Sequence, residues 1–204
     1  MYVDQASKEQ LQAALADLEN RYAQLQAAKL SLDLTRGKPN SAQLDLSNSL
    51  DGILDGQYKG ADGTDSRNYG GLDGQPEAKA LFCQMLGVKP EETLIGGNAS
   101  LTLMFQTLNY AHNFGVRGAA SAWNKEGKIK FLCPVPGYDR HFGICEELGI
   151  EMIPVAMDAN GPDMDQVEAL VKADKLIKGI WCVPRFSNPS GIVYSHQVVE
   201  RIAK

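Results

Sequence analysis

Strand and helix patterns alternate along the second half of the chain, and this alternation restricts the fold more than any other feature. From Pro76 onward, short apolar runs that favour strands alternate with amphipathic runs that favour helices. We expect strands at 129–133, 151–155 and 179–183, and helices at 76–86, 99–111, 139–148, 163–173 and 195–203. Asp163 and Ser195 are the expected N-caps of the last two helices, and Gly149 is an expected C-terminal cap. The order predicts an α/β fold with a mostly parallel sheet and helices on both faces.

The first part of the chain differs from the second in its composition and in the spacing of its apolar residues. Ser7 and Gln10 can form a capping box, and apolar residues then recur at helical spacing. We therefore expect residues 7–28 to form one amphipathic helix that packs against another element. Residues 30–75 are rich in Gly, Asp, Asn and Ser, which favours an extended arm with one short helix. The chain is accordingly divided into an N-terminal helix and arm, 1–50, and a larger domain, 51–204.

The composition excludes several classes of function. The formal charge is -5 and the basic residues are scattered, so no surface for nucleic acid or an anionic membrane is indicated. No apolar stretch is long enough to span a membrane and the N-terminus does not resemble a signal peptide, so we expect a cytoplasmic protein. The four cysteines form no CxxC pair and are interpreted as buried thiols, with no metal and no disulfide: Cys83, Cys133, Cys145 and Cys182.

A glycine turn directly precedes a predicted helix at Gly96-Gly97-Asn98-Ala99-Ser100. Backbone N–H groups at such a helix start can approach an anion, and the helix dipole favours its negative charge. This predicts a phosphate site. A purely structural glycine turn is the commoner explanation of such a segment, and the spacing is not that of a dinucleotide site.

Two further segments follow predicted strands, where ligands of parallel sheets bind. Tyr138 and His141 follow the strand at 129–133, and a tyrosine there can lie against a planar heterocycle. Core packing is the commoner role for both residues. Asn188-Pro189-Ser190-Gly191 follows the strand at 179–183, and its amide can donate a hydrogen bond to a phenolate oxygen.

A fourth segment, residues 68–77, is a glycine-rich loop that contains Tyr69 and leads into a helix through Pro76. Its acidic residues suggest a calcium loop. The ligand positions of a calcium loop are not in register here, however, so we do not expect a metal.

In this order, the four segments resemble those of fold-type I aminotransferases that depend on pyridoxal 5'-phosphate, in the aspartate aminotransferase class. The bacterial MocR-like branch is the most similar, and the resemblance extends from about Leu32 to Lys204. Asn188-Pro189-Ser190-Gly191 is close to the family's N-P-T-G, and the Tyr69 loop is similar to its N-Y-x-G-x-x-G-x-P-E. The resemblance implies an incomplete large domain, with residues 1–50 as part of a small domain. It also implies amino-group transfer between an L-amino acid, aspartate or glutamate, and a 2-oxo acid.

The resemblance assigns cofactor contacts to five residues. Asn188 would hydrogen-bond the 3-hydroxyl oxygen of pyridoxal 5'-phosphate, and Tyr138 would stack on its pyridine ring. Gly97, Asn98 and Ala99 would form the cup for its phosphate, although the family usually has Ser or Thr in place of Asn98.

Three more residues receive roles by the same resemblance. Tyr69 would reach the phosphate in the neighbouring subunit, which implies a homodimer with a shared active site. His141 would brace the aspartate that contacts the pyridine nitrogen, and Gly37 would lie over the substrate. Arg185 has no counterpart in the family pattern.

The catalytic residues of the family do not fall in this chain. The lysine that forms an imine with the cofactor, the aspartate at the pyridine nitrogen and the arginine that binds the substrate carboxylate all follow N-P-x-G. Only a short segment follows Gly191 here, and the chain ends within a predicted helix. We therefore expect a truncated chain that is inactive alone.

Two alternatives remain at this point. Another fold-type I enzyme, such as a β-lyase, a decarboxylase or a cyclopropane-forming synthase, would share the same cofactor frame. An effector-binding domain of a transcription regulator would need a helix-turn-helix domain ahead of the fold. Residues 1–30 form a single predicted helix and leave no room for one.

Overall fold

The computed structural model describes residues 6–32 and 37–204. The chain divides into two units, Met1–Tyr58 and Lys59–Lys204. Within the described ranges, no helix is both long enough and apolar enough to cross a membrane.

The first unit contains the helix α1 (Lys8–Ala27), the short helix α2 (Ser41–Leu44) and the 3-10 helix η2 (Asp45–Leu50). The predicted capping box is confirmed: the Ser7 hydroxyl accepts from the Gln10 N–H at 3.3 Å, and the Gln10 side chain accepts from the Ser7 N–H at 2.9 Å. No residue of α1 is buried. The expected packing of this helix on another element stays a prediction, and local capping accounts for where it begins.

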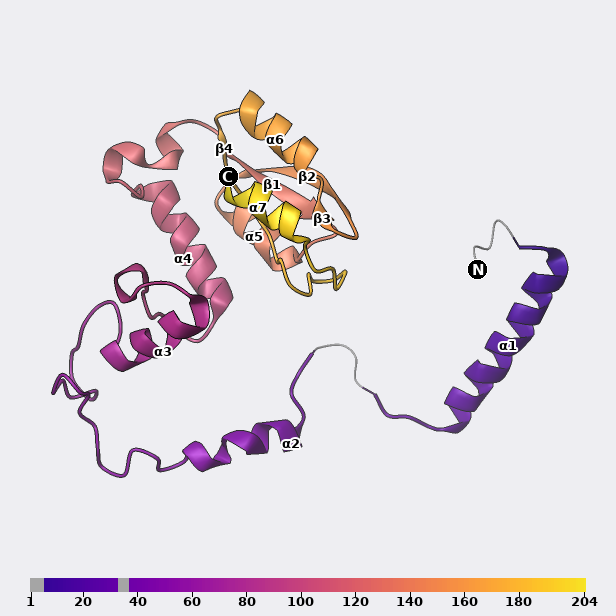
Figure 1. The fold of residues 1–204 in the computed structure, drawn as a ribbon, viewed down its shortest axis with the longest axis horizontal. Helices are drawn as coiled ribbons and strands as arrows, with labels where there is room; N and C mark the ends of the chain where they lie inside the picture. Colours follow the sequence, from indigo (N-terminus) through magenta and orange to yellow (C-terminus); the bar gives the residue numbers. More distant parts are fainter. Residues whose placement is uncertain (1–5, 33–36) are drawn as a thin grey trace. The chain divides into compact units, whose positions relative to one another are not determined.

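The second unit contains a four-stranded sheet of β1 (Lys130–Val135), β2 (Glu151–Asp158), β3 (Gly161–Pro162) and β4 (Ile177–Ile180). The strands lie in the order β3-β2-β1-β4 (Figure 1). β1 pairs in parallel with both β2 and β4, and only the two-residue β3 is antiparallel. The predicted α/β fold with a mostly parallel sheet is confirmed. β3 was not predicted, since two residues carry no periodicity.

The helices of this unit are α3 (Pro76–Leu86), α4 (Ser100–Asn113), α5 (Asp139–Glu147), α6 (Met164–Ala173) and α7 (His196–Ala203). Short 3-10 helices connect them: η3 (Pro90–Glu92), η4 (Ala119–Ser121) and η5 (Trp123–Lys125). All five α-helices occupy predicted positions. Asp163 and Ser195 cap α6 and α7 as expected, and Gly149 follows α5 with a left-handed φ of 66°.

β4 differs from its expected range of 179–183 and ends earlier, at Ile180. Its ladder continues only to Trp181, whose N–H donates to the Leu132 carbonyl at 3.0 Å. The backbone N–H and carbonyl groups of every second residue of β1 point toward β4. After Leu132 the next such residue is Pro134, which has no N–H to donate. The partner strand therefore ends the ladder, which the sequence of β4 alone could not indicate.

The core lies on both faces of the sheet, and β1 contributes alternate residues to each face. Phe131 and Cys133 pack with α4 and α5, in a cluster that includes Ile144 and Cys145. Leu132 packs on the opposite face with α6 and α7, in a second cluster of Val155, Met164, Val167, Tyr194 and Val198. The predicted covering of both faces is confirmed, and it determines where the connecting loops diverge.

Candidate functional site

The carboxyl ends of β1 and β4 form the point where the connections leave the sheet in opposite directions. β1 leads into α5 on one face, while the chain after β4 leads to α7 on the other face. Since β1 and β4 are neighbours, the loops that follow them separate where the two strands end. A crevice at such a point is the usual ligand site of an open α/β sheet.

Three aromatic rings meet at this point. Tyr138 is the N-cap of α5, and its ring lies 5.1 Å from the ring of His141 in an edge-to-face arrangement with an angle of 88°. The His141 ring stacks on Trp181 at 4.5 Å with an angle of 12°. His141 is 4% exposed, while Tyr138 is half-buried. Tyr138 and His141 therefore lie together, as their spacing within one helical turn requires.

The loop that carries Asn188 returns to the same place. Ser187 is 4% exposed, and its N–H donates to the Ile192 carbonyl at 2.8 Å. Ser187 lines a narrow cavity together with Tyr138, His141 and Trp181. The adjacent Asn188 has an exposed side chain. The structure thus brings the segment of Asn188 to the ring cluster through its buried neighbour.

The glycine turn at 96–100 opens α4, whose N-cap is Ala99. Leu101 in the first turn of α4 lines a shallow groove with Asp139 and Arg140 of α5. The beginnings of α4 and α5 are therefore close, which places Gly97, Asn98 and Ala99 near the start of the helix that carries Tyr138.

The glycine loop at 68–77 is joined to the segment before this turn. The Ile95 N–H donates to the Asp73 carbonyl at 3.0 Å, and Gly74 lies against Ile95 with a φ of 103°. Tyr69 is fully exposed at 101%. Gly37 belongs to the first unit, so its predicted place over the substrate stays a prediction.

Burial and hydrogen bonds shift the pKa values of three side chains around the ring cluster. Burial lowers the pKa of His141 below its ordinary value of 6.5, so its imidazole is neutral at pH 7. A hydrogen bond from the Cys133 thiol lowers the pKa of Cys145, and the Trp181 indole N–H, 3.2 Å from Cys145 Sγ, acts in the same direction. The pKa of Cys133 is correspondingly raised.

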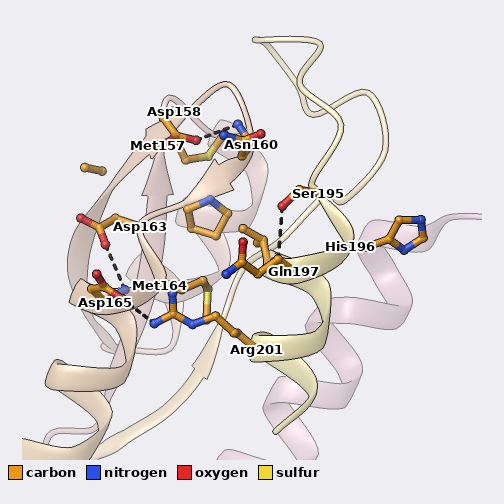
Figure 2. A pocket seen from close by; sticks show the side chains of 13 residues that line it. Met157, Asp158, Asn160, Asp163, Met164, Asp165, Ser195, His196, Gln197 and Arg201 are labelled. Carbon is orange, nitrogen blue, oxygen red and sulfur yellow. Dashed lines mark hydrogen bonds and ion pairs between the residues drawn. The ribbon is translucent and has the colours of Figure 1, made fainter.

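A larger cavity, of about 730 Å³, lies at the other edge of the sheet (Figure 2). It is lined by the β2–β3 turn and by the first turns of α6 and α7. Several of its charged groups pair within the fold: Arg201 pairs with Asp165 and Glu168 at 2.6 Å, and the Asp163 carboxylate caps α6. These ion pairs and caps stabilise the packing of α6 and α7 around the cavity. None of the predicted site residues lines it.

Trp181, Ser187 and Cys145 belong to the cluster but were not predicted as site residues. A signal existed for Trp181, since it directly follows a strand at the edge where ligands bind. Ser187 gave no signal, because a serine inside a turn segment is ordinarily exposed.

The residues around this point fit a flat ring that carries a phosphate. Within the described part of the chain, no side chain caps the start of α4, which leaves its first N–H groups free for an anion. A Cβ built on Gly97 meets nothing within 4 Å, so the space above this turn is open. Tyr138 supplies a half-buried aromatic face at the start of α5, and Asn188 supplies an exposed amide donor in the loop after β4.

Comparison with known proteins identifies the class of protein. The sequence matches the aspartate amino-transferase family over residues 6–204, and the chain therefore belongs to that family.

Individual relatives are longer than this chain. A curated relative from Mycolicibacterium smegmatis is 49% identical over 189 residues, which cover 91% of this chain and 44% of the relative. The aspartate aminotransferase of Corynebacterium glutamicum is 46% identical over 188 residues, which cover 92% of this chain and 43% of the relative. The chain thus spans less than half the length of these curated relatives.

Solved structures agree with the fold. A crystal structure of an aspartate transaminase from Corynebacterium glutamicum has a TM-score of 0.80 and 45% identity, covering 96% of this chain and 46% of that one. An α-aminoadipate aminotransferase from Thermus thermophilus, solved with N-(5'-phosphopyridoxyl)-L-leucine, has a TM-score of 0.59 and 19% identity, covering 81% of this chain and 38% of that one. The second likeness extends to the fold alone.

Proposed function

We propose that the protein is a pyridoxal 5'-phosphate-dependent aminotransferase that moves an amino group between aspartate or glutamate and a 2-oxo acid. The observation that carries this proposal is the meeting of Tyr138 and the Ser187–Asn188 segment between β1 and β4, beside the uncapped start of α4. Family membership supports amino-group transfer, and the Corynebacterium glutamicum relative is named an aspartate aminotransferase.

The cofactor would be held by residues of this chain in three ways. The free N–H groups after Gly97, Asn98 and Ala99 would donate to its phosphate, and the dipole of α4 would stabilise the charge. Tyr138 would lie against its ring. Asn188 would donate to its phenolic oxygen and so favour the ionised form.

His141 would act on the cofactor through another residue. Its imidazole is buried and neutral, and no hydrogen bond to its ring nitrogens occurs among the described residues. The ring nitrogens of His141 are therefore available to a polar partner. We propose that this partner is the carboxylate that faces the pyridine nitrogen, which in this family follows N-P-x-G.

The bound cofactor would supply an electron sink for removal of the substrate's α-proton. The lysine, aspartate and arginine that complete this chemistry would come from a longer protein, C-terminal to these residues, and the 204-residue chain alone would be inactive. Residues 1–50 would belong to a small domain with Gly37 over the substrate, and 51–204 to the cofactor-binding domain.

A homodimer with a shared active site is part of the proposal. The support is Tyr69, which is fully exposed on a loop that is hydrogen-bonded to the segment before the glycine turn at 96–100. An aromatic side chain in this position is available to a neighbouring subunit.

The test is a transfer assay on the full-length protein with pyridoxal 5'-phosphate, aspartate and 2-oxoglutarate. Equimolar glutamate and oxaloacetate are the expected products. Release of ammonia or carbon dioxide without glutamate would instead indicate a lyase or a decarboxylase on the same fold. Cofactor binding is measured by the absorbance of pyridoxal 5'-phosphate. A full-length protein that does not bind it would contradict the proposal as a whole.

A further inference from the structure

We propose that Trp181 is a positioning residue of the cofactor site: its indole fixes the ring of His141 and, through it, the ring of Tyr138. This inference rests on the function proposed above, in which Tyr138 lies against the cofactor ring. It adds a residue of β4's carboxyl end to a site otherwise formed by the loops.

The indole of Trp181 is held in place by three separate contacts. Its backbone N–H donates to the Leu132 carbonyl at 3.0 Å, which attaches the residue to β1. Its ring nitrogen donates to Cys145 Sγ at 3.2 Å, which attaches the ring to α5. Its ring also packs on Phe131 at 5.6 Å with an angle of 47°. A rotation of the indole would break the bond to Cys145 and the packing together.

The imidazole of His141 takes its orientation from this indole. The two rings are stacked nearly parallel, with 12° between their planes and 4.5 Å between their centroids. The outer torsion of a histidine side chain is broad, so hydrogen bonds or a flat neighbour must fix the ring plane. Among the described residues no hydrogen bond does so, and Trp181 is the flat neighbour.

Tyr138 completes the series of rings. The edge-to-face contact between His141 and Tyr138, at 5.1 Å and 88°, is a favoured aromatic geometry. Tyr138 lies at the N-cap, outside the regular helix, so the helix backbone restrains its ring less than it restrains His141. A tilt of His141 would therefore be passed to the ring that faces the cofactor.

The experiment compares leucine substitutions at two tryptophans in the full-length protein. Trp181→Leu removes the ring that stacks on His141. Trp123→Leu is the matched control, because Trp123 packs in the same cluster and contacts Phe131 at 6.1 Å. Trp181→Phe is the conservative variant, since it keeps a flat ring at the position.

Two readouts separate positioning from core filling. The first is the NMR shift of the His141 ring protons, which a stacked indole moves upfield. We expect Trp181→Leu to remove this upfield shift, while Trp123→Leu keeps it and Trp181→Phe keeps most of it. The second readout is the binding of pyridoxal 5'-phosphate, measured as its Kd and as the circular dichroism of the bound cofactor, here called the cofactor signal. We expect about a two- to tenfold weaker Kd and a reduced cofactor signal for Trp181→Leu only.

Equal effects of Trp181→Leu and Trp123→Leu on the cofactor signal would overturn the inference. Should Trp181→Leu not fold, Trp181→Met is compared with Trp181→Phe, because both fill the space and only phenylalanine keeps a flat ring against His141. Equal Kd values and equal His141 shifts in these two variants would then overturn the inference. A wild-type protein that binds no cofactor would refute the proposed function instead, while the His141 shift would still report on the ring series.

Discussion

The backbone N–H of Ile95 donates to the carbonyl of Asp73 at 3.0 Å, and this bond joins the glycine-rich loop of Tyr69 to the turn that precedes α4. Two segments that are separate in the sequence thus share one anchor. Gly74 makes the approach possible, because a Cβ at this position would lie 2.4 Å from the Ile95 Cβ.

Substitution of Gly74 should therefore be costly. Gly74→Ala combines a left-handed φ of 103° with this overlap, and we expect a loss of about 2–4 kcal/mol in the free energy of unfolding. Gly63→Ala is the control: its φ is also left-handed, at 82°, but a Cβ there meets nothing within 4 Å, so about 1 kcal/mol is expected. Urea denaturation measures both. Equal losses would show that the overlap with Ile95 relaxes freely.

Gly97→Ala should separate stability from cofactor binding. Its φ is not left-handed and a Cβ there meets no atom within 4 Å, so the unfolding free energy should change by less than about 0.5 kcal/mol. The added methyl group would occupy space that the cofactor phosphate needs, and Kd for pyridoxal 5'-phosphate should rise about tenfold. An unchanged Kd would place the phosphate elsewhere.

Asn188→Ala should weaken the cofactor without unfolding the loop. The Asn188 side chain is exposed, while the backbone of Ser187 and Ile192 holds the loop. Loss of a hydrogen bond to a charged oxygen predicts a Kd about ten- to a hundredfold higher. Ser190→Ala in the same loop should leave Kd within about twofold. Absorbance titration of the full-length protein gives both values, and similar Kd changes in the two variants would remove Asn188 from the site.

His141 should make the protein less stable in acid. Because burial lowers its pKa in the folded state, the unfolded chain binds a proton first as the pH falls below about 6.5. Stability is therefore complete above this pH and decreases below it. His141→Phe keeps a flat ring and removes the titration. The neighbouring Tyr138, Trp181 and Cys145 side chains gain no positive charge as the pH falls.

Denaturation at pH 7 and pH 5 tests this expectation. The wild-type protein should lose more stability between the two values than His141→Phe does. A loss of the same size in both proteins would mean that other groups cause the acid sensitivity.

Much of the fold could be predicted from short stretches of sequence. The helix positions and the caps at Ser7, Asp163 and Ser195 follow from the spacing of apolar residues and from single side chains that accept backbone N–H groups. The same local signals placed Tyr138 and Asn188 after strands. The order of strands and helices also predicted helices on both faces, because parallel strands need crossovers.

Only the tertiary structure decided which loops meet. The placement of β4 beside β1, rather than beside β2, sets Ser187 and Trp181 against Tyr138 and His141, although some forty residues separate the two segments in the sequence. The end of β4 depended in the same way on a proline in its partner strand. Local patterns determine backbone conformation within one element, whereas pairing and burial between distant elements depend on how the whole sheet packs.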